Sequence, residues 1–268
     1  MGLLEGRIVL VNGGTQGIGA AVARAAAREG AVVAVTGRRP ELGEALVAEL
    51  ASSSPVGWES PSAGAKAMFV RADLADAEQA KAAVAQVIAA HGRIDCLVNS
   101  AGLTSRGSLL DTTPELFDAH IAVNLKGPFF AMQAAVADMV ARKAPGTIVN
   151  IISTCAHGGP PFLAPYSAAK AGLAGLTRNA AHAHRWDRIR INGLNIGWTA
   201  TEGEDATQRT FHGAGDNWRD EAARGLPMGK LGQPDEIADF VVLLLSDRSG
   251  VVTGSVIDWD QTVLGGLD

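Results

Sequence analysis

The sequence predicts an α/β protein built on a doubly wound parallel β-sheet of about seven strands, with helices on both faces. Three observations lead to this fold class. Short apolar runs alternate with longer alanine-rich stretches, the runs are apolar at nearly every position, and a glycine-rich turn follows the first of them. Strands that are covered on both faces are continuously apolar, and right-handed β-α-β crossovers wind such a sheet in both directions.

Six runs have the length and the valine and isoleucine content of strands, namely 7–11, 31–36, 67–71, 95–99, 147–152 and 189–196. Helical patterns lie between them. In the stretch 75–90, Val84, Val87 and Ile88 recur at the spacing of one helix face. Asp76 and Gln79 stand three apart before this face, which is the spacing of a helix capping box.

Composition narrows the class of protein. A chain of 268 residues with 47% hydrophobic residues can fill one core, so residues 1–268 are interpreted as a single domain. A net charge of −5 argues against nucleic-acid binding, which needs a basic face. No run approaches the roughly 20 apolar residues of a membrane span. Two cysteines suit a reducing compartment, so we expect a cytoplasmic protein.

Two segments depart from the alternation of strands and helices. The segment 51–65 is rich in Ser, Pro and Gly and is predicted to be a surface loop distant from catalysis. The segment 201–226 is polar and predicted to be helical in pieces, and it could form a lid over a ligand. Its hydrogen-bonding side chains suit a polyhydroxylated substrate, or they face solvent; they are Glu202, Glu204, Asp205, Gln208, Arg209, His212, Asp216 and Asn217.

The glycine-rich turn has the spacing G-x-x-x-G-x-G, with glycines at 13, 17 and 19. Glycines permit a tight turn and let backbone N–H groups approach a pyrophosphate at a helix N-terminus, as in a Rossmann-type nucleotide site. The alternative is that the turn only connects a strand to a helix. The nucleotide interpretation predicts contacts to a cofactor from Gly13, Thr15, Gln16, Gly17, Ile18 and Gly19.

The end of the second strand favours NADP(H) over NAD(H). Gly37 stands there in place of an acidic side chain, and Arg38 and Arg39 follow it. A guanidinium suits the 2′-phosphate of NADP, whereas a carboxylate would repel it. The alternative is that both arginines only solvate the start of a helix.

Tyr166 and Lys170 are four residues apart at the start of an alanine-rich segment, so on a helix they share one face. A phenol has a reference pKa near 10 and is a poor base at neutral pH, but a nearby ammonium group favours the phenolate. We therefore expect the pKa of Tyr166 to lie below 10, which would suit Tyr166 to acid–base catalysis.

Together with other motifs, this pair resembles the short-chain dehydrogenase/reductase family over nearly the whole chain. Ser153 precedes Tyr166 by the family's separation of 13 residues (153 to 166). The other matching motifs are the three glycines, Asp73-Leu74, Asn99-Ser100-Ala101-Gly102, Asn124, and Gly197, Thr199 and Thr201.

The resemblance implies a role for each of these positions. Tyr166 would transfer the hydroxyl proton, Ser153 would hold the substrate oxygen, and Lys170 would lower the phenol pKa and bind the nicotinamide ribose. Asn124 would position a water that relays protons. The cofactor contacts implied are Asp73 and Leu74 beside the adenine, with Asn99, Ala101, Gly102, Tyr166, Lys170, Gly197, Thr199 and Thr201. The family also implies a homo-tetramer packed through the helices that end near Met139 and Trp186.

Three features depart from the family pattern. Ile196 precedes Gly197 where the family has proline, Asp260-Gln261-Thr262 replaces an Asp-Gly-Gly turn, and the segment 51–65 is inserted. None of them falls on the four catalytic positions.

The sequence thus predicts an NAD(P)(H)-dependent oxidoreductase that interconverts a secondary alcohol and its carbonyl compound, with a sugar- or polyol-like compound as one substrate class. A 3-oxoacyl thioester reductase and a non-catalytic nucleotide-binding sensor are the alternatives. No metal is expected, because zinc-binding motifs are absent and His182 and His184, two apart, point to different sides of a helix.

Overall fold

A computed structural model describes residues 2–52 and 67–263 of the chain. Its centre is a seven-stranded sheet in the order β3-β2-β1-β4-β5-β6-β7, in which every neighbouring pair is parallel. The predicted fold class is confirmed. The strands are β1 Ile8–Asn12, β2 Val32–Gly37, β3 Ala67–Arg71, β4 Cys96–Asn99, β5 Gly146–Ile151, β6 Ile189–Ile196 and β7 Val256–Trp259.

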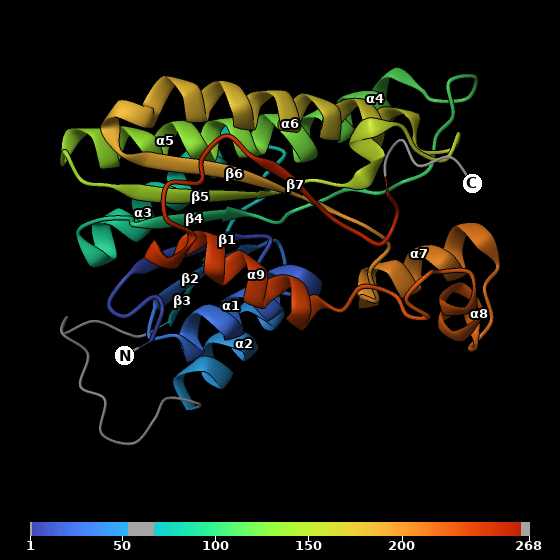
Figure 1. Ribbon diagram of the computed structural model, residues 1–268, viewed down its shortest axis with the longest axis horizontal. Helices are drawn as coiled ribbons and strands as arrows, with labels where there is room; N and C mark the ends of the chain where they lie inside the picture. Colours follow the sequence, from blue (N-terminus) through green and yellow to red (C-terminus); the bar gives the residue numbers. More distant parts are fainter. Residues whose placement is uncertain (1, 53–66, 264–268) are drawn as a thin grey trace.

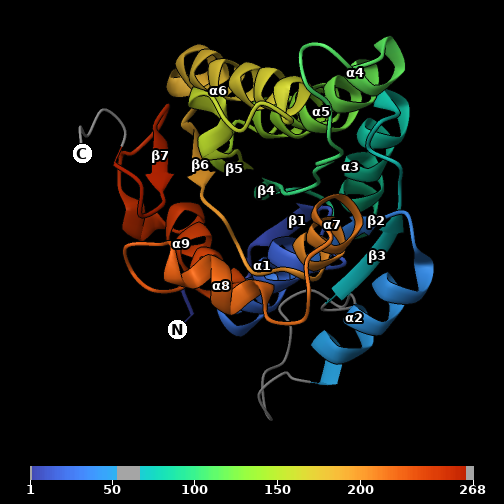
Figure 2. The ribbon, with the colours of Figure 1, turned by 90° about the vertical axis from the view of Figure 1, so that its right-hand side faces the viewer.

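Helices cover both faces of the sheet (Figures 1 and 2). One face carries α1 Gly17–Arg28, α2 Pro40–Ser52 and α9 Pro234–Leu245, and the other carries α3 Ala77–His91, α4 Pro114–Ile121, α5 Gly127–Ala141 and α6 Ala164–His184. Successive residues of β1 enter different cores: Val9 and Val11 pack in the cluster with α1 and α9, Ile8 and Leu10 in the cluster with α3 and α5. Both faces of the strand are buried, and for this reason its sequence is apolar without alternation.

The start of α3 shows how the chain fixes the turn after β3. The Asp76 carboxylate accepts hydrogen bonds from the N–H groups of Glu78 and Gln79, at 2.8 and 3.3 Å, so the predicted cap is confirmed. Gln79 reaches back further than a capping box requires, because its side-chain oxygen accepts from the Asp73 N–H at 3.0 Å. This bond holds Asp73 just beyond the carboxyl end of β3.

The segment predicted to be a lid forms α7 Glu202–His212 and α8 Trp218–Arg224, which project beyond the end of the sheet (Figure 1). The ring of buried Trp218 stacks on Trp198 at 6.0 Å and donates to Asp205 at 2.7 Å, which fixes α8 to its neighbours. The prediction of helices in pieces is confirmed. Of the predicted loop 51–65, Ala51 and Ser52 belong to α2 instead, and the remainder lies outside the described residues.

Two further predictions concern the surface. No helix in the described part of the chain is both long enough and apolar enough to span a membrane. Trp186, just past α6, is 83% exposed and available for a subunit contact, whereas Met139 of α5 is fully buried inside the protein. The homo-tetramer stays a prediction.

Candidate functional site

The glycine turn lies between β1 and α1, where the strand order reverses beside β4. Gly13 has φ +71°, and a Cβ there would lie 2.6 Å from the backbone of Ala101; a Cβ on Gly19 would lie 2.2 Å from the Gly13 carbonyl oxygen. Gln16, the N-cap residue of α1, makes no side-chain capping hydrogen bond within the described residues. The first N–H groups of α1 are therefore available to an anion, which fits a dinucleotide pyrophosphate.

A row of buried polar side chains crosses the carboxyl ends of four strands. Asn12 donates to Asn99 at 3.0 Å, Asn99 to Asn150 at 2.8 Å, and Asn150 to Thr177 of α6 at 2.9 Å. Thr36 closes the row on the β2 side with a bond to Asn12 at 3.1 Å. Asn99 thus uses its side chain to align the strands, while its backbone is paired in the sheet between β1 and β5. Asn150 was missed by the motif analysis, although its register with Asn99 follows from the pairing of β4 with β5.

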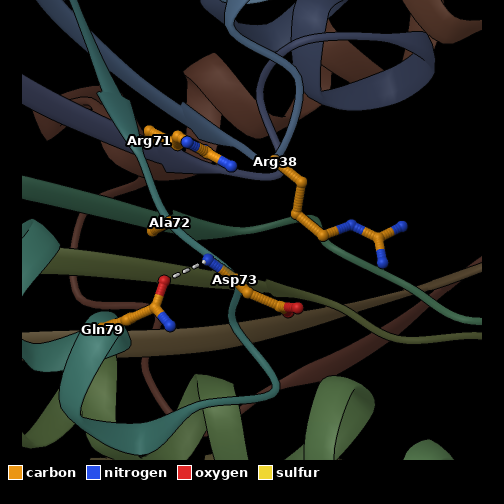
Figure 3. Close-up of a pocket in the computed structure, with 5 residues that line it drawn as sticks. All are labelled: Arg38, Arg71, Ala72, Asp73 and Gln79. Carbon is orange, nitrogen blue, oxygen red and sulfur yellow. Dashed lines mark hydrogen bonds between the residues drawn. The ribbon is translucent and has the colours of Figure 1, made fainter.

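A cavity of about 410 Å³ opens beside the ends of β2 and β3. Figure 3 shows Arg38 reaching out from the end of β2, with Arg71 and Asp73 on the strand end beside it and Gln79 bonded to the Asp73 N–H. Neither arginine has an ion-pair partner among the described residues. Where the adenosine end of a dinucleotide is expected, the cavity therefore presents two cations that have no ion pair within the described residues, together with the carboxylate of Asp73.

The structure separates the two arginines that the sequence grouped together. Arg39 does not line the cavity; its guanidinium donates to the side chain of Gln16 in the glycine turn. Arg71 was missed because it belongs to a strand pattern, yet its place two residues before Asp73 brings it to the same edge as Arg38. Thr15, also in the glycine turn, packs against Gly37, where a Cβ would lie 2.6 Å from its methyl group.

The predicted proton-transfer residues come together in the structure. Tyr166 and Lys170 lie in the first turns of α6 and are 8% and 3% exposed, and the Lys170 Nζ lies 5.7 Å from the centroid of the Tyr166 ring. Ser153, which follows β5, lies close enough to Tyr166 to lower the pKa of its phenol. Lys170 Nζ donates to the Ile151 carbonyl at 2.8 Å.

The electrostatics of this group correct one expectation. Burial raises the pKa of Tyr166 above its ordinary value, against the smaller lowering effects of the Ser153 hydrogen bond and the positive charge of Arg106. The prediction that this pKa lies below 10 is therefore wrong for the protein alone. Burial lowers the pKa of Lys170 to about 8, so Lys170 loses its positive charge at a lower pH than an ordinary lysine does.

Asn124 is fully buried in a π-helical turn, Ala122–Lys126, between α4 and α5. Its side chain is already occupied: the oxygen accepts from the Leu103 N–H at 2.9 Å, and the nitrogen bonds to the Leu103 carbonyl and to His120, at 3.0 and 3.2 Å. His120 is also fully buried and meets the Tyr166 ring edge-on at 6.1 Å. It was missed, although it stands four residues before Asn124 on the same helix face.

The remaining predicted positions lie at several points around the site. The Thr201 methyl group would lie 3.4 Å from a Cβ on Gly17, and Thr199 pairs with Gly232 in an isolated bridge. Leu74 is buried below Asp73, and Gly102 lies beside Asn124. Gln261 explains one departure from the family pattern, because its side chain holds the segment after α8 by bonds to Met228 and Lys230, at 2.7 and 2.8 Å.

The lowered pKa of Lys170 predicts a pH-dependent stability. Because the folded value is about 8 and the ordinary value is 10.5, the unfolded chain binds more protons between these values, and the free energy of unfolding should rise with pH across that window. The limit is about 3 kcal/mol, at about 1.4 kcal/mol per pKa unit. Lys170→Met should flatten the rise between pH 8 and 10 in urea-denaturation curves; equal slopes in the two proteins would contradict it.

Comparison with known proteins agrees with this geometry. Residues 13–263 match a family model described as enoyl-(acyl carrier protein) reductase. The chain is 36% identical over 264 residues to a Thermotoga maritima protein named 3-oxoacyl-[acyl-carrier-protein] reductase FabG, covering 98% of both chains. It is also 36% identical over 257 residues to an uncharacterized oxidoreductase of the same organism, covering 96% of both. A crystal structure, that of gox2181, superposes with a TM-score of 0.82 at 29% identity, covering 95% of this chain and 94% of the other.

Proposed function

The chain belongs to the short-chain dehydrogenase/reductase family and is an oxidoreductase of that family, and from this premise we propose that it interconverts a small polar secondary alcohol and its carbonyl compound. The observation that carries the proposal is the burial of Tyr166 beside Lys170, with Ser153 acting on the same phenol. A non-catalytic sensor would not need to keep a buried proton donor next to a nucleotide site.

In the proposed reduction, the Tyr166 hydroxyl donates its proton to the substrate oxygen while Ser153 holds the same oxygen. Burial keeps Tyr166 protonated at neutral pH, which suits it to this donor role. Lys170 faces the Ile151 carbonyl and can donate further hydrogen bonds to a ribose. Since the Asn124 side chain is occupied by Leu103 and His120, a relay water would be bound by the Asn124 backbone rather than by the amide.

A nicotinamide dinucleotide fits the residues present and, when bound, exchanges the hydride. The glycine turn and the α1 N-terminus would hold its pyrophosphate, and Arg38 and Arg71 would hold a 2′-phosphate. Asp73 and Leu74 would border the adenine. We accordingly propose NADP(H) in preference to NAD(H).

The polar side chains of the lid support the proposal of a polar substrate only in part. Arg209 pairs with both Asp205 and Asp216, at 2.8 and 3.0 Å, so these groups stabilise the lid itself. Glu204 is different, because its negative charge raises the pKa of both Tyr166 and Arg106. Its carboxylate also accepts hydrogen bonds from Trp198 and Gln208, at 2.8 and 2.7 Å.

A 3-oxoacyl thioester reductase is the second candidate. Several relatives carry that name. A second cavity of about 410 Å³ beside Ser167 offers an apolar wall from Leu109, Leu110, Pro160 and Pro161, which could receive an acyl chain.

A substrate panel tests the two candidates. Purified protein is assayed with both nicotinamide cofactors against polyols, sugars, hydroxy acids and acyl thioesters of increasing chain length. We expect kcat/KM to be highest for small hydroxylated compounds, because the groups of the site that could orient them are polar. A steady rise of kcat/KM with acyl length would contradict the polar-substrate proposal and favour the thioester.

A further inference from the structure

Arg106 is a half-buried cation between the lid and the proton-transfer residues. Its Nη1 donates to the Thr104 carbonyl at 2.9 Å, and its Nε and Nη2 both donate to His212 Nε2 of α7, at 3.2 and 3.1 Å. The guanidinium carbon lies 5.2 Å from the centroid of Phe162 and 5.9 Å from that of Phe211. These contacts fix the plane of the guanidinium with neutral partners only.

No described carboxylate lies within ion-pair distance of Arg106. Of its five N–H groups, three are directed at Thr104 and His212, which leaves two for another acceptor. Glu204 attracts Arg106 electrostatically, but its bonds are to Trp198 and Gln208. A partly desolvated cation without a counterion costs free energy unless an anion arrives, and burial accordingly lowers the pKa of Arg106.

The Arg106 loop is joined to the start of α6. The Gly107 N–H donates to the Phe162 carbonyl at 2.9 Å, and the Gly107 carbonyl accepts from the Ala164 N–H at 3.0 Å, two residues before Tyr166. The guanidinium is close enough to Tyr166 to lower the pKa of its phenol. Arg106 therefore lies on a loop that is bonded to the start of α6, the helix that carries Tyr166.

We propose that Arg106 binds a carboxylate of the substrate, so that the substrate is a hydroxy acid or the corresponding oxo acid. The inference rests on the proposed function, which it narrows. A planar guanidinium is matched to a carboxylate by paired N–H···O bonds, and one held between aromatic rings is already oriented for them. Because His212 Nε2 accepts from Arg106, the same residue that binds the anion also fixes α7 of the lid.

The first experiment compares each of several small hydroxy acids with its uncharged amide, using the wild-type protein, Arg106→Gln and Arg106→Lys. We expect the wild type to prefer the acid by about 100-fold in kcat/KM, mainly through KM, and Arg106→Gln to reduce that ratio to near one. Arg106→Lys keeps the positive charge but not the planar pair of N–H donors of a guanidinium, and it should give an intermediate ratio. Arg28→Gln is the matched control: Arg28 pairs with Asp239 on the surface, at 3.3 Å, and its variant should keep the wild-type ratio.

The second experiment measures binding without turnover. In Tyr166→Phe, the hydroxy acids of the panel are titrated while the tryptophan fluorescence is followed, to which the stacked pair Trp198 and Trp218 contributes, and the titration is repeated with Arg106→Gln added. We expect saturable binding of the acids, weakened at least 10-fold by the second substitution. Suppose the acids bind saturably in a way that depends on Arg106, but the wild type does not turn them over. This result would support the anion site and would overturn the proposed substrate class of the oxidoreductase.

Two results would overturn the anion site itself. One is turnover of neutral alcohols or pantetheine thioesters at least as fast as of the acids, with Arg106→Gln affecting both alike. The other is the absence of saturable binding of any acid in the panel.

Discussion

Replacing Tyr166 with Phe should lower kcat in both directions by about 1,000-fold while leaving the Kd for the cofactor nearly unchanged. The substitution removes only a hydroxyl, so the ring keeps its contacts with His120 and Lys170, 6.1 and 5.7 Å away. What is lost is the hydroxyl that we propose as the proton donor. Nicotinamide absorbance measures the rate, and fluorescence titration measures cofactor binding. A loss below tenfold would remove Tyr166 from the catalytic step.

Tyr166 is also the single tyrosine of the chain, so a spectrophotometric titration reports one phenol. Without nucleotide, its pKa should lie above 10 because the side chain is buried. Arg106→Gln should raise the pKa further, since Arg106 is a cation that lowers it. Oxidised cofactor should lower it through its positive ring. A phenolate signal below pH 9 in the nucleotide-free protein would contradict the burial argument.

The sign of this shift determines the pH profile. Carbonyl reduction needs the protonated phenol and should persist from neutral pH upward until the phenol ionises. Alcohol oxidation needs a proton acceptor, so its rate should rise with pH over the same ionisation.

Arg38→Asp should lower the ratio of kcat/KM with NADPH to that with NADH by about 100-fold or more. The substitution removes a charge-assisted bond and places a carboxylate where the 2′-phosphate would lie, so loss of attraction and added repulsion act together. Arg71→Gln removes a cation without adding an anion and should cost the ratio about tenfold. Steady-state kinetics with both cofactors measures each ratio.

Arg39→Gln is the control for this series. Arg39 is adjacent in sequence but bonds to Gln16 rather than lining the cavity, so its replacement should affect both cofactors alike. A wild-type preference for NADH, or a ratio that Arg38→Asp leaves unchanged, would overturn the NADP(H) proposal.

Local sequence was enough to predict six strands and the kind of sheet, because strands covered on both faces are apolar throughout. The seventh strand was predicted only through the expected total of about seven strands, without a position in the sequence. Val256–Trp259 has four residues and lies at the sheet edge, where none of its side chains is fully buried, so it carries no such run. Short spacings likewise sufficed for the Tyr166–Lys170 pair, since four residues on a helix fix a shared face.

The sequence by itself determined the fold class and the family motifs of this protein, because both depend on contiguous runs of residues and on short spacings between residues. Tertiary structure alone decided the rest of the site. Arg106 meets His212 across 106 positions of the chain, and Arg71 joins Arg38 only because β2 and β3 are neighbours. The pKa of Tyr166 was misjudged for the same reason: the spacing showed the nearby lysine, but desolvation depends on every segment that packs around the phenol.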